Sequence, residues 1–389
     1  MEKSTNFANF LAKTVTLPAI FGRFTDVRND PEIKLRDILM SIFLMPFFRI
    51  RSLLSLDRIC RERQFKQLFA CKREMVVSDS TVARVLNWIK PEEADEMLRA
   101  LVPHFERDHL LQTRLIPGGK ERRIGIVDGS CMGKHFISAL VLHGKVDFPV
   151  FVRPIEKRGK ELPVSNAMLK EAKKALGESF PDLLAFDALY FNQHTFKIVR
   201  RLGSHILVKS RDASFRDVLQ DAECLFGARG TMQDDITKSS GYDAQRLCEW
   251  SAEMIESEFA GYTIQILRVK ECYTKKGKEE TFWVATTDMS LSLEEAREAA
   301  HRRWHIENNV FKRLSKHTGS KTFYFKESTR FLNLLKVFCA AIAVLNAYIH
   351  SIRQNEEHFN RLCDGIKATW ANIFSRIAET LLPGAFAFS

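Results

Sequence analysis

Residues 123–155 read RIGIVDGSCMGKHFISALVLHGKVDFPVFVRPI, and this stretch decides the fold. Its runs of β-branched and aromatic side chains predict three strands, at 123–127, 136–142 and 148–155. Asp128-Gly129 and His143-Gly144 end the first two runs, and the charged turn 156–160 ends the third. Because the connections are short, the three strands are predicted to pair antiparallel.

Beyond this stretch, the pattern alternates between helix and strand. Helical spacing is found over 163–176 and 191–202, and each of these segments is closed by a glycine. Short apolar runs at 183–186 and 205–208 predict further strands. Three antiparallel strands followed by helix, strand, helix and strand is the order of an α/β, ribonuclease-H-like core. This step is an analogy of fold, which alone does not prove function.

The sequence as a whole is predicted to comprise five segments. A helical N-terminal domain (1–117) ends near Pro117-Gly118-Gly119 and precedes the first part of the α/β core (118–211). A β-rich insertion (212–287) follows, with strands predicted at 245–250, 262–269 and 281–286. The last helix of the core (288–327) and a helical C-terminal region (328–389) complete the chain.

The composition indicates a soluble protein and favours a polyanionic partner, with a basic protein that has no such partner as the alternative. The 389 residues carry a formal net charge of +11 and are 45% hydrophobic. A basic excess of this size favours nucleic acid. The longest apolar stretch, 337–349, is shorter than the roughly 20 residues of a membrane-spanning helix, so we expect a buried core helix and no membrane. No Cys-x-x-Cys pair occurs among the eight cysteines, which favours a reducing cytoplasm.

Three carboxylates are candidates for a metal site. Asp128 and Asp187 each follow an apolar strand, where ligands commonly bind, although either one alone is more simply a turn residue. Glu307 falls on a helix predicted from Ser292 to about Ser315. At 100° per residue it lies among four apolar side chains, Trp304, Val310, Phe311 and Leu314. Such a carboxylate needs a cation, either a metal or Arg303 one turn earlier.

Together, Asp128, Asp187 and Glu307 predict a site for two Mg²⁺ ions, with Mn²⁺ as a substitute. Two such ions would activate an attacking hydroxyl and stabilise the leaving oxygen in phosphoryl transfer.

These motifs resemble those of bacterial insertion-sequence DDE transposases, in particular the insertion-sequence-four family. The matching segments are Ile-Val-Asp-Gly-Ser around Asp128, Phe-Asp-Ala-Leu-Tyr around Asp187, and residues 303–311 around Glu307. The resemblance covers about residues 30–330 and implies a catalytic trio of these three acids. It also implies a β-rich insertion, cut-and-paste movement of DNA, a homodimer joined through the C-terminal helices, and a bacterial, nucleoid-associated cytoplasmic protein.

The third motif departs from the family at two positions. The family pattern has Tyr seven residues before its Glu and Lys seven residues after it, where this chain has Ala300 and Leu314. Both positions are predicted to share the face of Glu307, which puts the family's DNA contact there in doubt. Lys312, Arg313 or Lys316 are candidates to compensate, beside the family's Arg303.

Other candidate DNA contacts are helix and turn residues and, because the family often forms a DNA hairpin with a flipped base, the aromatic Trp283. Arg84 and Asn87 lie on the polar side of a helix capped near Ser78, which suits a groove-reading helix or an ordinary surface helix. The remaining candidates are basic residues in turns and one aromatic residue for a flipped base: Lys275, Lys276, Lys278, Arg158, Lys160 and Trp283. For each of these, a solvated charge or a core side chain is the simpler interpretation.

Three functions remain open from the sequence. The first is an active transposase. The second is a catalytically decayed or repurposed DNA-binding protein, which Ala300 and Leu314 favour. The third is a nuclease of the same fold that cuts but does not join. Strongly salt-dependent DNA binding is expected of all three.

Overall fold

The computed structural model describes most of the chain and divides it into two compact units. The described residues are 7–62, 77–157, 159–210, 222–224, 237–240, 247–273, 278–304, 306–318, 325–353 and the single positions 373, 377 and 381. Unit 1 comprises 1–111, 129–158 and 307–389, and unit 2 comprises 112–128 and 159–306. The protein is mixed α/β, with helices towards both ends of the chain.

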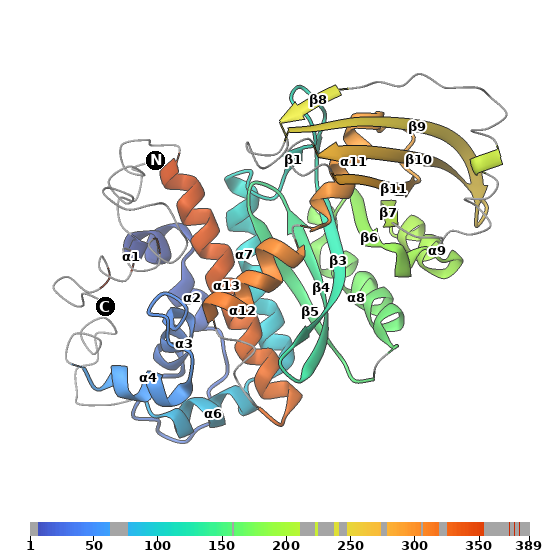
Figure 1. Cartoon of the computed structure of the whole chain (residues 1–389). Helices are drawn as coiled ribbons and strands as arrows, with labels where there is room; N and C mark the ends of the chain where they lie inside the picture. Colours follow the sequence, from blue (N-terminus) through green and yellow to red (C-terminus); the bar gives the residue numbers. More distant parts are fainter. Residues whose placement is uncertain are drawn as a thin grey trace. The chain divides into compact units, whose positions relative to one another are not determined.

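Unit 1 is built around one long helix, α13 (Ser328–Arg353), which is buried along most of its length. An apolar helix needs cover on every side, and here α3, α6, α7 and strand β5 pack against it (Figure 1). The helices of this unit are α1 (Phe7–Asn9), η1 (Phe10–Thr14), α2 (Leu17–Phe21), α3 (Leu35–Leu44), α4 (Leu53–Cys60), α6 (Asp79–Trp88), α7 (Pro91–Arg107), α12 (Lys312–Thr318) and α13.

Helix α13 is the one described helix that is long and apolar enough to cross a membrane. Its apolar window is entirely buried inside the protein, as expected for the core helix of a soluble protein. Helix α13 also belongs to the region predicted to form the dimer, 328–389. The surface of α13 is used within unit 1, and most of the chain beyond Arg353 lies outside the described residues.

The predicted cap at Ser78 is confirmed. The Ser78 hydroxyl accepts a hydrogen bond from the Thr81 backbone N–H at 3.2 Å and begins α6. At the other end of α6, the Asn333 amide of α13 donates to the Leu86 and Ile89 carbonyls, each at 2.9 Å. Helix α3 begins at Leu35, after Lys34 as its N-cap residue.

Replacing the cap tests how α6 is held. We expect Ser78→Ala to lower the free energy of unfolding by about 1 kcal/mol, because a helix N–H loses its acceptor. Ser78→Thr keeps the hydroxyl and should stay within about 0.5 kcal/mol of the wild type. Urea unfolding measures both variants, and an equal loss in the two would argue against the cap.

The strands of unit 1 are β4 (His135–His143) and β5 (Asp147–Ile155), paired antiparallel as predicted, and the second half of β3 (Ile124–Met132). The strand order there is β5-β4-β3. Strand β3 crosses from one unit to the other between Asp128 and Gly129. The prediction that β3 ends in a turn at Asp128-Gly129 was wrong. The polar residues that suggested a turn continue the strand to Met132, because backbone pairing tolerates them there.

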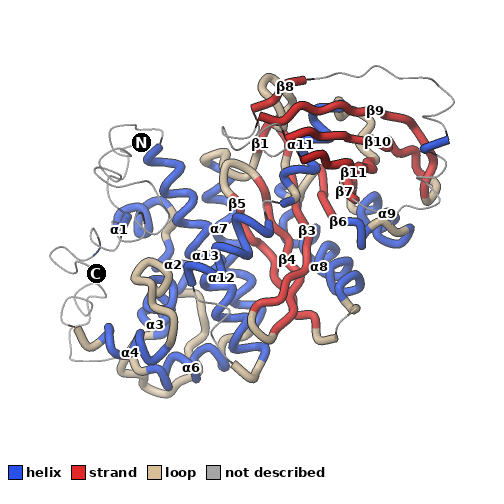
Figure 2. Tube along the Cα trace, viewed as in Figure 1, coloured by secondary structure: helices blue, strands red, loops and turns tan. Residues whose placement is uncertain are grey.

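Unit 2 is a mixed sheet with the order β3-β6-β7-β11-β10-β9-β8 (Figure 2). Strands β3, β6 and β7 are parallel, and β11, β10, β9 and β8 continue the sheet antiparallel. The strands are β1 (Thr113–Arg114), β2 (Glu121–Arg122), β6 (Leu183–Asp187), β7 (His205–Ser210), β8 (Thr237–Ser240), β9 (Leu247–Phe259), β10 (Tyr262–Tyr273) and β11 (Lys278–Thr286). The segment predicted as a β-rich insertion therefore extends the sheet of β6 and β7.

The helices of unit 2 confirm the predicted alternation after β5. They are α8 (Glu161–Leu176), η2 (Gly177–Ser179), η3 (Ala188–Tyr190), α9 (Gln193–Arg201) and α11 (Leu293–Arg302). Gly177 and Gly203 follow α8 and α9 with φ of 55° and 78°, a conformation that glycine adopts at low cost.

Candidate functional site

Asp128 and Asp187 lie at the same level of neighbouring parallel strands. Strands β3 and β6 pair with Ile124 opposite Leu183 and Ile126 opposite Ala185. The pairing ends there, and the same register continued by two residues along each strand places Asp128 opposite Asp187. Neighbouring residues in register point to the same face of a sheet, about 4.8 Å apart from strand to strand. The two aspartates named from the sequence are therefore adjacent.

Each aspartate also has a local partner. The Asp187 carboxylate caps η3 by accepting from the Leu189 N–H at 2.9 Å. Asp128 is 6% exposed, and its Oδ2 is 3.3 Å from Nη1 of Arg303. Arg303 is itself buried and lies one residue past α11. The arginine of the third sequence motif thus contacts the aspartate of the first.

A lysine that sequence analysis missed lies beside Asp187 on the next strand, so that Asp128, Asp187 and Lys209 form a row across β3, β6 and β7. Lys209 of β7 lies opposite Asp187 in the parallel register. Its Nζ is 3.7 Å from the ring centre of Phe282 and 4.0 Å from that of Trp304. Aromatic faces attract ammonium groups in this geometry. The signal that found the aspartates, a charged residue directly after an apolar strand run, also occurs at His205–Val208 followed by Lys209.

The charges in this row compensate one another. Two carboxylates about 5 Å apart repel by about 3 kcal/mol at an effective dielectric constant of about 20. Arg303 brings a positive charge to Asp128, and Lys209 is the register partner of Asp187 on the neighbouring strand. The two aspartates therefore lie on the same sheet face as two buried cationic side chains, Arg303 and Lys209.

A buried carboxylate fixes α11 to the sheet and so positions Arg303. Glu271 of β10 accepts from Arg297 Nε at 2.7 Å, His301 Nε2 at 2.6 Å and the Tyr273 hydroxyl at 2.7 Å. Burial by itself raises the pKa of Glu271, but the His301 hydrogen bond and the charges of His301 and Arg297 hold that pKa at about 2. Burial lowers the pKa of His301.

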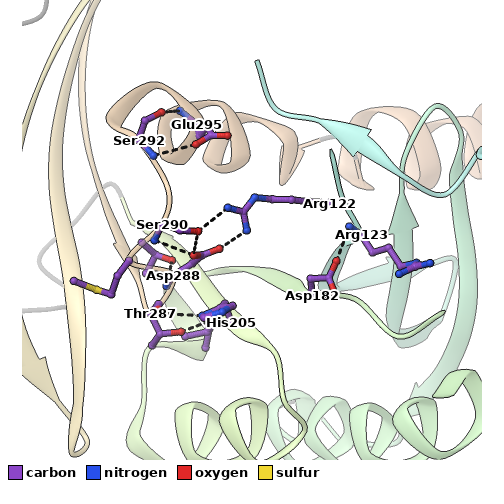
Figure 3. Close-up of polar contacts among 12 residues, drawn as sticks. Arg122, Arg123, Asp182, His205, Thr287, Asp288, Ser290, Ser292 and Glu295 are labelled. Carbon is purple, nitrogen blue, oxygen red and sulfur yellow. Dashed lines mark hydrogen bonds and ion pairs between the residues drawn. The ribbon is translucent and has the colours of Figure 1, made fainter. Parts of the chain in front are cut away.

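The connection into α11 is held by a second set of contacts (Figure 3). Arg122 forms a buried ion pair with Asp288 and donates to the Ser290 hydroxyl at 2.9 Å. Burial raises the pKa of Asp288, but the Ser290 hydrogen bond and the Arg122 charge hold it below its usual range. Ser292 and Glu295 then form the capping box that begins α11. The helix start predicted at Ser292 is confirmed.

The prediction that Glu307 lies in an apolar stripe was wrong. The predicted helix, from Ser292 to about Ser315, is interrupted after α11, and η5 (Ile306–Phe311) is a π-helix. A π-helix has hydrogen bonds between residues i and i+5, so the 100° per residue of an α-helix no longer gives the directions of its side chains. Val310, Phe311 and Leu314 are buried, whereas Glu307 is exposed in unit 1. The aspartate pair belongs to unit 2.

The two departures from the family motif are both core residues. Ala300 and Leu314 are buried, in unit 2 and unit 1 respectively, and neither shares the exposure of Glu307. The prediction that they share its face was therefore wrong. The three residues suggested as replacements differ in their surroundings. Lys312 and Lys316 are exposed, and Arg313 donates to the Asn346 side chain at 3.2 Å.

The other DNA-contact candidates differ in their exposure. Arg84 and Asn87 are exposed on α6, as predicted. Trp283 is 7% exposed in β11, with the Arg268 guanidinium 5.9 Å from its ring centre, as expected of a core side chain. Lys160 and Lys278 are exposed, and Lys278 pairs with Glu280. Lys275, Lys276 and Arg158 lie outside the described residues.

The donor set fits a divalent cation in part. Carboxylate oxygens are the ligands that Mg²⁺ and Mn²⁺ prefer, and Asp128 with Asp187 supplies two such groups on one face. Within the described ranges, no three His, Cys, Asp or Glu side chains come together as a metal-ligand group.

Comparison with known proteins gives no family. No family model matches the chain, and no curated protein matches it significantly.

Proposed function

We propose that this protein is a DDE-type DNA transposase, in which Asp128 and Asp187 bind the divalent cations that support DNA strand cleavage and joining. The observation that supports this most strongly is the register of β3 and β6, which makes the two aspartates neighbours on one sheet face. Two unrelated turn aspartates would have no reason to align. Glu307 remains the proposed third acid, from its motif.

The order of elements also supports a ribonuclease-H-like core. Strands β3, β4 and β5 follow one another with short turns, and helices α8 and α9 then alternate with β6 and β7. Strands β6 and β7 run parallel to β3. In this interpretation β8 to β11 are the β-rich insertion between the second aspartate and the glutamate.

The residues of the site have separable roles in the proposal. Bound Mg²⁺ would supply Lewis-acid activation of the hydroxyl and charge neutralisation at the phosphate. Asp128 and Asp187 would hold the cation from one side. The Arg303 guanidinium, beside Asp128, would orient that carboxylate and offer hydrogen-bond donors to a phosphate. No covalent bond between a side chain and DNA is required.

The proposed partner is double-stranded DNA, as element ends and as target. A net charge of +11 supports this, and phosphate contacts dominate such affinities. Pairing of two ends supports the proposed homodimer, and a cytoplasmic, nucleoid-associated location follows from the same function. Exposed Arg84, Lys312 and Lys316 are the proposed phosphate contacts within the described residues.

Salt dependence tests the proposed contact at Arg84. We expect Arg84→Ala to weaken DNA binding at low salt and to reduce the slope of log K against log[salt] by about 1, because one phosphate contact is lost. Arg61→Ala is the matched control, since Arg61 is also exposed in unit 1 and pairs with Asp57. Fluorescence anisotropy from low to high salt measures both, and equal slopes would remove Arg84 from the interface.

The function itself is tested by cleavage of a labelled DNA that carries the sequence flanking the gene. We expect strand nicking at the element end with Mg²⁺ or Mn²⁺, none with chelator, and joining of the released 3′ end to target DNA. Specific binding without cleavage in either metal would contradict the proposal. It would indicate the repurposed DNA-binding protein, which the apolar Ala300 and Leu314 favour. Cleavage without joining would indicate a nuclease.

A further inference from the structure

We propose that Lys209 is a positioning residue of the aspartate site, which neutralises Asp187 and sets the affinity of the site for a divalent cation. This inference rests on the proposed function. It concerns a residue outside the acidic trio and outside the motif around Glu307. Its basis is the placement of Lys209 in unit 2, opposite Asp187 in the strand register.

The backbone places the lysine beside the aspartate. Strands β6 and β7 are paired in register over five residues, and the last pair is Asp187 with Lys209. On the other side of β7, Lys209 is opposite Val284 of β11. The lysine is therefore held between two paired strands and points to the face shared by Asp187 and Asp128.

The Lys209 side chain is buried against aromatic rings. Lys209 is 5% exposed, and its ammonium lies over two aromatic rings, at 3.7 Å from Phe282 and 4.0 Å from Trp304. Phe282 and Trp304 are in turn contacted by the His301 ring, at 5.4 Å and 5.8 Å between ring centres. Burial of a lysine ammonium is costly without compensating charge or aromatic faces.

The same side chains connect the lysine to Arg303. Trp304, which covers the ammonium, directly follows Arg303, whose guanidinium is 3.3 Å from Asp128. The residues that follow α11 therefore contact both parts of the site. Arg303 contacts Asp128, and Trp304 covers the ammonium of Lys209, the register partner of Asp187. A divalent ion at the aspartates would be repelled by the Lys209 charge, so this charge limits how tightly the ion binds.

The test is Mn²⁺ binding to the full-length protein, followed by the electron paramagnetic resonance signal of free Mn²⁺. We expect Lys209→Met to bind Mn²⁺ about tenfold more tightly than the wild type, because a nearby positive charge is removed. Lys209→Arg keeps the charge and should stay within about twofold of the wild type. Lys174→Met, at an exposed position on α8, is the matched control and should not change the affinity.

A purely structural role would give the opposite sign. If Lys209 only supported the fold, Lys209→Met would loosen the site and weaken Mn²⁺ binding, and that result, or an unchanged affinity, would overturn the proposal. If Asp187→Asn abolishes binding while Lys209→Met binds like the wild type, the role of Lys209 fails and the proposed function stands. If the wild type binds no Mn²⁺, both fail.

A measurement on the wild-type protein covers the case in which Lys209→Met does not fold. In ¹³C-lysine-labelled protein, the rings of Phe282 and Trp304 should shift the Lys209 side-chain resonance away from those of the surface lysines. Lys209→Arg assigns this resonance. We expect the resonance to move in proportion to bound Mg²⁺. A position that stays constant through saturation would overturn the proposal.

Discussion

Asp128→Asn and Asp187→Asn should each lower metal-dependent DNA cleavage by about 1000-fold while leaving DNA binding unchanged. The two carboxylates share one face at the same level of β3 and β6, so either loss removes half of the described ligand set. Charge stabilisation by a bound metal ion contributes several kcal/mol to phosphoryl transfer, and about 4 kcal/mol corresponds to this factor. Single-turnover cleavage of end-labelled DNA measures the effect.

The asparagine variants should remain folded. In Asp187→Asn, the amide oxygen of the new side chain can still cap η3, and either change relieves repulsion between the two carboxylates. Asp182→Asn is the matched control. Asp182 lies just before β6, where its Oδ2 accepts from the Arg123 N–H at 3.1 Å (Figure 3). We expect Asp182→Asn to cleave at the wild-type rate. Full cleavage by Asp128→Asn or Asp187→Asn would contradict the assigned site.

Glu271→Ala should lower the free energy of unfolding by about 3–5 kcal/mol, which is the range for breaking a buried ion pair. Glu271 is almost completely buried, and its removal leaves the Arg297 guanidinium buried beside His301 without this acceptor. Urea unfolding measures the loss. Glu279→Ala, at an exposed position on β11, should change stability by less than about 0.5 kcal/mol. Similar losses in both variants would show that the Glu271 contacts contribute little.

Acid should unfold the protein through the same residues. The folded-state pKa of Glu271, about 2, is below its ordinary value of 4.5. Its stabilisation is therefore complete above pH 4.5 and is lost as the pH falls from 4.5 towards 2. The pKa of His301 is also lowered, from an ordinary value of 6.5, so protonation of the unfolded chain begins to favour unfolding below that pH. In Glu271→Gln, the dependence between pH 4.5 and 2 should be weaker.

The regular elements of the fold could be predicted from local pattern. Strands β4 and β5 and helix α8 match the prediction within two residues, because their apolar spacing and their turns agree with each other. Strand β3 was predicted too short, since Asp128-Gly129 has turn chemistry but is held in the sheet by its neighbours. How β11 joins β7 depends on residues far apart in sequence, which no local pattern specifies.

The candidate site was predictable where it depends on charged residues that directly follow apolar runs. Asp128 and Asp187 each follow an apolar run, and a constant offset of 187 − 128 = 59 residues equals the β3–β6 register, 183 − 124 = 59. Lys209 has the same local signal, but its role depends on Phe282 and Trp304, which tertiary packing brings to it. The exposure of Glu307 could not be predicted, because a change from α- to π-helix alters the direction of every following side chain.

The central claim is that a divalent cation binds at Asp128 and Asp187, and Fe²⁺-directed cleavage of the protein backbone tests it most directly. Fe²⁺ bound in place of Mg²⁺, with ascorbate and peroxide, generates hydroxyl radicals that cut the chain close to the ion, and mass spectrometry identifies the cut positions. We predict cuts near residues 128 and 187, suppressed by excess Mg²⁺ and absent in the Asp128→Asn/Asp187→Asn double variant. Cuts concentrated elsewhere in the chain, or unchanged in the double variant, would contradict the claim.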